Sequence, residues 1–212
     1  MFNILLIHDD LDEKRGDYFS ASHQNMIDKL SILDLPNLQS LNTNLCLANS
    51  IDHYTSAFKG QPFIFVAYAH GSEDTLEVGG EQYIHERNAY FFSETLFYAC
   101  SCLSAKSLGL TLMNEGCRVF AGYDARISTL NPECEPIFYE CENAFLTHFL
   151  TTNNTIQDSL RFMYHKYQEM GYHLQNEFNT FTASELLEGN LKAFKLFCND
   201  EDKLLTKSHF IQ

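Results

Sequence analysis

Residues 62–72 read Pro62-Phe63-Ile64-Phe65-Val66-Ala67-Tyr68-Ala69-His70-Gly71-Ser72, and residues 95–102 read Thr95-Leu96-Phe97-Tyr98-Ala99-Cys100-Ser101-Cys102. In the first stretch the apolar run 63–69 is followed by His70-Gly71-Ser72, and in the second the apolar run 96–100 is followed by Ser101-Cys102. A short apolar run without polar alternation, rich in aromatic and branched residues, predicts a strand that is buried on both faces. These two stretches therefore predict central strands of a mostly parallel sheet.

The rest of the chain alternates strand and helix patterns around these two stretches. An alternating pattern around Gly79-Gly80 predicts a hairpin, and residues 38–48 are ambiguous, with a strand as one reading. Such alternation predicts an α/β fold, with helices on both faces of the sheet, in one domain spanning residues 1–212. Further strands are expected at 2–7, 117–123 and 193–198, and helices at 13–35, 51–58, 103–115, 133–151 and 155–170.

Composition narrows the classes of partner. The chain has 14 Lys+Arg against 28 Asp+Glu, a formal net charge of −14. That field repels nucleic-acid phosphates and anionic lipids, so neither a nucleic acid nor a membrane is an expected partner. The seven cysteines are odd in number and irregularly spaced, which is typical of reduced thiols. The first residues lack the features of a signal peptide, and a cytoplasmic location is expected.

Two chemically active side chains directly follow the two central strands. His70 follows one strand and Cys102 follows the other, so both are expected at the carboxyl edge of the sheet, where α/β folds place their sites. An imidazole can convert a thiol into the nucleophilic thiolate at neutral pH. The backbone N–H of Gly71 is a candidate donor to a developing oxyanion, because glycine allows a close approach.

The ordered combination of these stretches resembles the caspase-like cysteine peptidases, and within them the bacterial CHAT and gingipain-related branches. The resemblance rests on His70-Gly71 after one strand, Ser101-Cys102 after the next, Leu108-Gly109 on the following helix, and a strand that closes on Gly122-Tyr123. It covers residues 62–124 well and the ends only by pattern. It implies a caspase-like domain and a cysteine endopeptidase with a His-Cys dyad.

Two cysteines compete for the role of nucleophile. Counting back from Cys102, the residues from Leu96 to Ser101 preceded by Thr95 match the family's strand in full. Counting from Cys100 gives a shorter strand, but Ala99-Cys100 reproduces the Ala-Cys pair of many relatives. The pattern favours Cys102, with Cys100 as the alternative.

The resemblance also implies the partners. The substrate is expected to be a protein or peptide, and a regulator is expected on a separate chain because no sensor domain is appended here. No cofactor or metal is expected. Asp10 and Asp124 follow the first and third apolar strands, at the edge where a basic substrate side chain would bind, although loop and capping roles suit them too.

Other readings use the same residues differently. A caspase-like domain with an inactive thiol would serve as a protein-interaction module. A phosphoacceptor domain would use the acidic pair after residues 4–7 together with Lys106, but Asp52 does not end a strand as an acceptor should. A zinc site from His70, Cys100 and Cys102 lacks a fourth ligand. An α/β-hydrolase is disfavoured because the chain has no G-x-S-x-G motif.

Overall fold

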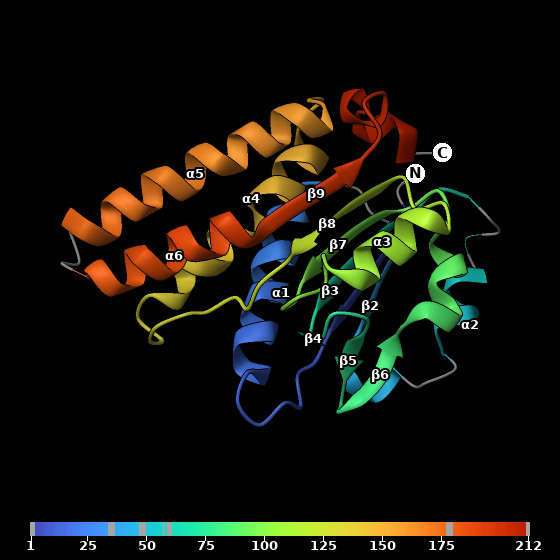
Figure 1. Cartoon of the computed structure of the whole chain (residues 1–212), viewed down its shortest axis with the longest axis horizontal. Coiled ribbons are helices and arrows are strands. Elements are labelled where there is room, and N and C mark those ends of the chain that lie inside the picture. Colours follow the sequence, from blue (N-terminus) through green and yellow to red (C-terminus); the bar gives the residue numbers. More distant parts are fainter. Residues whose placement is uncertain are drawn as a thin grey trace.

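A central six-stranded sheet organises the computed structural model, which describes residues 3–33, 37–46, 50–56, 58, 61–176 and 180–210 (Figure 1). The strand order is β2-β1-β3-β7-β8-β9, and every neighbouring pair is parallel except β8 and β9. The strands are β1 (Asn3–His8), β2 (Asn37–Leu41), β3 (Ile64–Tyr68), β7 (Leu96–Cys100), β8 (Val119–Tyr123) and β9 (Phe194–Cys198).

The middle of this sheet is buried on both faces, as the continuous apolar runs predict. Every residue of β3, β7 and β8 is buried. The register pairs Ile64 with Leu96 and Tyr68 with Cys100, so β3 and β7 end side by side. The expected α/β class, a mostly parallel sheet between helices, is confirmed.

Two helical layers cover the sheet (Figure 1). On one face, the core includes residues of α1 (Gly16–Leu30), α4 (Glu135–Thr151), α5 (Ile156–Asn176) and α6 (Phe181–Ala193). On the other face, it includes residues of α2 (Ser50–Ser56), the 3-10 helix η2 (Glu86–Phe92) and α3 (Ser107–Asn114). Each layer buries one set of alternating strand side chains.

A second, small sheet lies at the carboxyl edge of the central sheet, and His70 belongs to its first strand. Its strands are β4 (His70–Gly71), β5 (Leu76–Val78) and β6 (Glu81–Ile84). The predicted hairpin is confirmed, because Gly79 and Gly80 turn the chain with φ of 61° and 78°. Asp9, buried after β1, fixes this turn by accepting the Gly79 N–H at 3.0 Å.

Several element bounds differ from the sequence expectation. The helix expected at 13–35 is shorter, Gly16–Leu30, and the ambiguous 38–48 region splits into β2 and the 3-10 helix η1 (Thr43–Leu45). Helix α6 and the 3-10 helix η2 had not been predicted. Two further 3-10 helices, η3 (Asp202–Leu204) and η4 (Lys207–Phe210), follow β9. Phe2 and Gly60, expected at element ends, lie outside the described residues.

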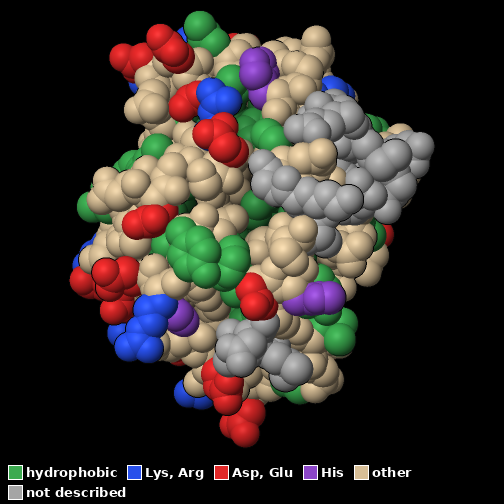
Figure 2. Space-filling view, turned by 90° about the vertical axis from the view of Figure 1, so that its right-hand side faces the viewer, with side chains coloured by type: hydrophobic (Ala, Val, Ile, Leu, Met, Phe, Trp, Pro, Cys, Tyr) green, Lys and Arg blue, Asp and Glu red, His purple; other side chains and the backbone are tan. Residues whose placement is uncertain are grey.

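The surface reflects the acidic composition. On the face shown in Figure 2, Asp and Glu side chains are scattered across the described part of the surface. Among the described residues, none of the helices combines the length and the apolar character needed to span a bilayer.

Candidate active site

The site is built where β3 and β7 end. Ser101, one residue beyond β7, donates its hydroxyl hydrogen to the carbonyl of Ala69, one residue beyond β3, at 2.8 Å. This hydrogen bond links the segment that follows β7 to the segment that follows β3. His70 follows Ala69 and Cys102 follows Ser101, and both line the same pocket.

Gly71 allows the segments after β3 and β7 to pack this closely. A Cβ at this position would lie 2.3 Å from Ser101 Oγ and 2.5 Å from the backbone oxygen of Cys102. Real Cβ atoms do not approach other atoms so closely, so only glycine fits without displacing the backbone of Cys102. The His-Gly pair is therefore in direct contact with the Ser-Cys pair.

Cys102 sits in a turn, where its thiol is partly exposed. Its Sγ donates to the carbonyl of Ile127 at 3.9 Å. The next residue, Leu103, has φ of 61°, which is uncommon for a residue with a side chain, and its N–H donates to the carbonyl of Ala125 at 3.2 Å. Such strain clusters at functional sites and is held in place by surrounding structure.

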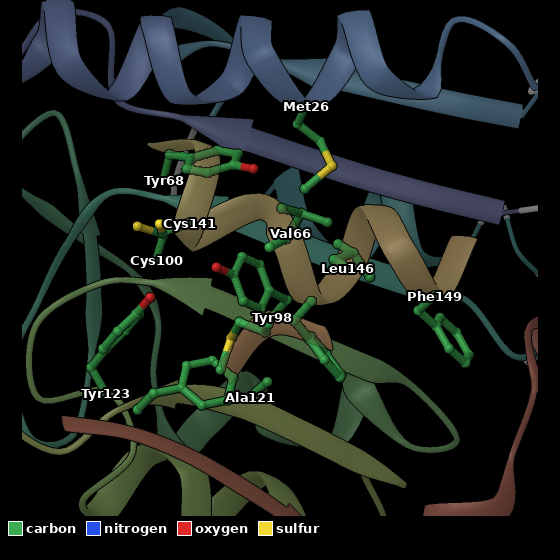
Figure 3. Packing of buried hydrophobic residues seen from close by; sticks show 14 of the residues in the cluster. Met26, Val66, Tyr68, Tyr98, Cys100, Ala121, Tyr123, Cys141, Leu146 and Phe149 are labelled. Atoms are coloured by element: carbon green, nitrogen blue, oxygen red, sulfur yellow. The ribbon is translucent and has the colours of Figure 1, made fainter. Parts of the chain in front are cut away.

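Cys100, by contrast, is inside the core. It is the last residue of β7, is fully buried, and lies among Tyr68, Tyr98 and Tyr123 (Figure 3). Burial, then the nearby Glu142 carboxyl, raises the pKa of the Cys100 thiol well above its ordinary value. The strand ends between the two cysteines, and this separates their surroundings.

His70 is held by a carboxylate from the loop after β1. Its Nε2 lies 3.0 Å from Oδ2 of Asp12. The other oxygen, Oδ1, accepts the backbone N–H groups of Lys14 at 3.0 Å and Arg15 at 2.6 Å. Burial acts to raise the pKa of Asp12, but these hydrogen bonds and the neighbouring His70 lower it overall, so the carboxylate form is favoured.

The pocket beside this pair is small, with a volume of about 50 Å³. Most of its wall is apolar, and its polar side chains come from separate elements. It is lined by Arg15, Tyr18, Phe19, Ala69, His70, Ser101, Cys102, Ile127, Ser128, Thr129 and Glu142.

Glu142 is a deeply buried acidic residue of the lining, with an exposed fraction of 1%. Its Oε2 accepts the hydroxyl groups of Tyr18 at 2.7 Å and Ser22 at 3.3 Å. Among the described residues, no partner is found for Oε1. Burial raises the pKa of Glu142 to about 7, against the lowering effect of its hydrogen bonds.

The two aspartates considered for substrate binding lie elsewhere. The Oδ1 of Asp10 accepts the N–H of Thr43 at 3.0 Å, and Asp124 pairs with Lys195 Nζ at 3.0 Å. Neither residue lines the pocket beside Cys102. The structure therefore brings His70, Gly71 and Cys102 together, but it does not bring Asp10 or Asp124 to them.

Sequence reasoning missed Asp12 and Glu142. Asp12 belongs to the same acidic loop as Asp10, but the sequence does not show which carboxylate of this loop meets His70. The sequence gives only a weak indication of Glu142. It lies at helical spacing from Phe138, Phe145 and Phe149, so a charged residue occupies a position on an otherwise apolar helix face.

The competing uses of these residues find little support in the geometry. Among the described residues, no group of three or more His, Cys, Asp or Glu side chains is placed to hold a metal ion. Lys106 pairs with Glu73 at 2.6 Å, while Asp9 is committed to Thr43 and Gly79. These contacts give the acidic pair after β1 a structural role.

Comparison with known proteins gives limited information. No family model matches the sequence, and no curated protein matches it. One similar solved structure is that of a secreted C11 cysteine protease from Bacteroides thetaiotaomicron in complex with an irreversible peptide inhibitor, with 12% identity and a TM-score of 0.49. The match covers 80% of this chain and 59% of that chain.

Proposed function

We propose that this chain is a cysteine endopeptidase of the caspase-like kind, with His70 as the base and Cys102 as the nucleophile. The observation that carries the proposal is the meeting of a partly exposed thiol and a carboxylate-held imidazole in one pocket at the carboxyl edge of the sheet. A nucleophile, a base and a group that orients the base are the three parts of an activated cysteine.

In the proposed reaction, His70 takes the thiol proton of Cys102. The thiolate sulfur bonds to the carbonyl carbon of the scissile amide, and the backbone N–H groups of Gly71 and Cys102 stabilise the oxyanion. The C–N bond then breaks, and His70 gives its proton to the leaving amine. Water hydrolyses the thioester, releasing the new carboxyl group and restoring the thiol.

Asp12 is proposed to orient the base. Because Nε2 of His70 points to Asp12 at 3.0 Å, Nδ1 is the ring nitrogen that remains for the thiol proton. A carboxylate on one nitrogen fixes the tautomer and stabilises the imidazolium that forms during reaction.

The burial of the two cysteines supports the choice of Cys102. A thiolate at Cys100 would be created in the core next to Glu142, and burial already raises the pKa of that thiol. Cys102 lines the pocket and is partly exposed. A protein or peptide substrate, regulation by a separate chain and a cytoplasmic location belong to the same proposal.

Thiol labelling tests this proposal directly. Purified protein is treated with an iodoacetamide probe at pH 6, and the modified cysteines are mapped by mass spectrometry. Cys102 should react at least about 10-fold faster than Cys198, the other partly exposed thiol, because Cys102 shares its pocket with His70, whereas burial raises the pKa of the Cys198 thiol. In His70→Ala, Cys102 should fall to the rate of Cys198.

Asp12→Asn sharpens the test, because asparagine keeps the shape but not the charge. It should lower the Cys102 rate while leaving Cys198 unchanged. Uniform low reactivity in wild type, indifferent to His70, would contradict the proposal. That outcome would favour an inactive protein-interaction module.

A further inference from the structure

The pocket beside Cys102 is in position to receive a substrate side chain. The residue whose carbonyl is attacked, P1, carries its side chain on the carbon next to that carbonyl. A carbonyl at Cys102 Sγ therefore places the P1 side chain in the space that Cys102 and His70 share, and this space is the pocket of about 50 Å³. Its volume suits the end of a short side chain.

The buried end of this pocket has an unmet hydrogen-bonding need. Glu142 is 1% exposed, and its Oε2 accepts the hydroxyl groups of Tyr18 and Ser22. No described group makes a hydrogen bond of normal geometry to Oε1, although the buried Cys100 thiol lies beside this carboxyl. A buried polar oxygen without a full set of partners is unfavourable, because it has lost its hydrogen bonds to water. A ligand that brings an N–H donor would recover that cost.

The same lining carries a positive charge. Arg15 donates from Nη1 to Thr129 Oγ1 at 2.7 Å, and its guanidinium stacks over the Tyr18 ring at 5.9 Å from the ring centre. The same Nη1 lies 4.0 Å from Oε1 of Glu135. A guanidinium has five N–H donors, so Arg15 can still serve an acceptor on a ligand. The lining thus presents a carboxyl group and a guanidinium together.

Resting on the proposed peptidase function, we propose that this pocket selects a carboxamide side chain, Asn or Gln, as the P1 residue. The amide nitrogen would donate to Glu142 Oε1, and the amide oxygen would accept from Arg15. A carboxamide is neutral, short, and both donor and acceptor, so it matches the two groups at once.

Charged P1 side chains match only half of the lining. A Lys or Arg side chain would place a second positive charge beside Arg15, and an Asp or Glu side chain would face Glu142. Burial also raises the pKa of Glu142 to about 7, so a proton is present on this carboxyl over much of the range below neutral pH. A carboxamide can pair with either form of Glu142, whereas a cation pairs well only with the ionised one.

The test uses peptidyl acyloxymethyl ketones that differ only at P1, with Asn, Gln, Lys, Asp or Leu. The Cys102 thiolate forms an S–C bond to the methylene carbon, and the C–O bond breaks to release a carboxylate, so mass spectrometry counts single events without turnover. Wild type should react with the Asn or Gln reagent about 10-fold faster than with the others, as expected for a matched buried polar pair.

Two variants then exchange the partners of the carboxamide. Glu142→Gln keeps an oxygen for Tyr18 and Ser22 but turns a donor toward the pocket, so the preference should move toward Asp by about 10-fold. Arg15→Gln removes the charge, so the Lys reagent should gain. Arg161→Gln, on the exposed face of α5, is the matched control and should change nothing.

The outcomes separate this proposal from the proposed function. If iodoacetamide labels Cys102 in a His70-dependent way but Lys, Asp or Leu is the fastest P1, the peptidase survives and the carboxamide pocket is refuted. If no reagent and no iodoacetamide reacts selectively at Cys102, the proposed function itself fails. Should Glu142→Gln not fold, Arg15→Gln still decides, since an unchanged P1 preference there contradicts the pocket.

Discussion

The two faces of the central sheet are built from different aromatic residues. The face toward α2, η2 and α3 carries Phe65, Phe97 and Phe120. The face toward α1, α4 and α5 carries Tyr68, Tyr98 and Tyr123, which Figure 3 shows. All six side chains are fully buried. The faces therefore differ by hydroxyl groups, not by burial.

The three phenylalanines form a row of packed rings across the sheet. Phe65 and Phe97 have ring centres 4.5 Å apart, and Phe97 stacks on Phe120 at 5.6 Å. Phe120 in turn stacks on Phe197 of β9 at 5.7 Å. This row crosses four strands of the sheet and adds apolar area without any polar atom to satisfy.

The tyrosine face is a hydrogen-bonded layer. The Tyr68 hydroxyl donates to Asn143 Oδ1 at 2.6 Å, and the Tyr98 hydroxyl donates to the backbone carbonyl of Glu142. Tyr18 of α1 donates to the Glu142 carboxyl at 2.7 Å. Burial of a carboxyl group is less costly where hydrogen-bond donors lie beside it. Glu142 can line a pocket because the tyrosine row, unlike the row of Phe65, Phe97 and Phe120, supplies hydroxyl groups.

The largest expected effect comes from removing the centre of the phenylalanine row. Phe97→Ala should destabilise the protein by about 3–5 kcal/mol, because a fully buried ring leaves a cavity that its neighbours cannot fill. Urea denaturation followed by circular dichroism measures the change. A loss below about 1 kcal/mol would show that the row does not form one packed unit.

The second effect is a pH dependence of the unfolding free energy, which Glu142 gives to the tyrosine face. The pKa of Glu142 is raised by burial from 4.5 to about 7, so the folded state holds this proton more tightly than the unfolded chain does. The stabilising contribution is full below about pH 4.5 and is lost as the pH rises to about 7. The difference amounts to about 3 kcal/mol.

Glu142→Gln removes this dependence. From pH 5 to pH 8, wild type should lose about 2–3 kcal/mol of unfolding free energy relative to Glu142→Gln. The measurement is urea denaturation of both proteins at each pH, with Phe97→Ala as a control that should run parallel to wild type. Parallel curves for Glu142→Gln would contradict a raised pKa.

A hydroxyl group added to the phenylalanine face should lower the unfolding free energy by less than Phe97→Ala does. Phe97→Tyr places a polar group between rings that offer it no partner, and the expected loss is about 1–3 kcal/mol. The same denaturation assay measures it. A neutral result would mean that the hydroxyl finds a partner and that the two faces are more alike than their residues suggest.

The sequence was sufficient for the strands because the apolar runs at 64–68 and 96–100 are continuous and buried on both faces. It also placed His70 and Cys102 at one edge, since parallel neighbouring strands end together. Asp12 could not be chosen from the sequence, because its contact with His70 depends on the path of the loop before α1. No local pattern describes that path.

Three other features could not be predicted from local sequence patterns. Cys100 and Cys102 have the same strand parity, so only the observed end of β7 at Cys100 separates a core thiol from a pocket thiol. Glu142 depends on how α4 packs over the tyrosine layer. Helix α6 was missed because its burial comes from contact with α5 and the sheet, and its own apolar pattern is short.

The smallest expected effect tests the hydrogen bonds of the tyrosine layer one at a time. Tyr68→Phe leaves the ring in place but removes the donor to Asn143 Oδ1, and the expected loss is about 1 kcal/mol. Tyr123→Phe is the matched control, because its hydroxyl meets that of Tyr167 only at 3.4 Å, and it should cost less than about 0.5 kcal/mol. Both are measured by urea denaturation at pH 6. Equal and negligible losses would mean that this layer gains no stability from its hydroxyl groups, so their role would be limited to making room for a buried carboxyl.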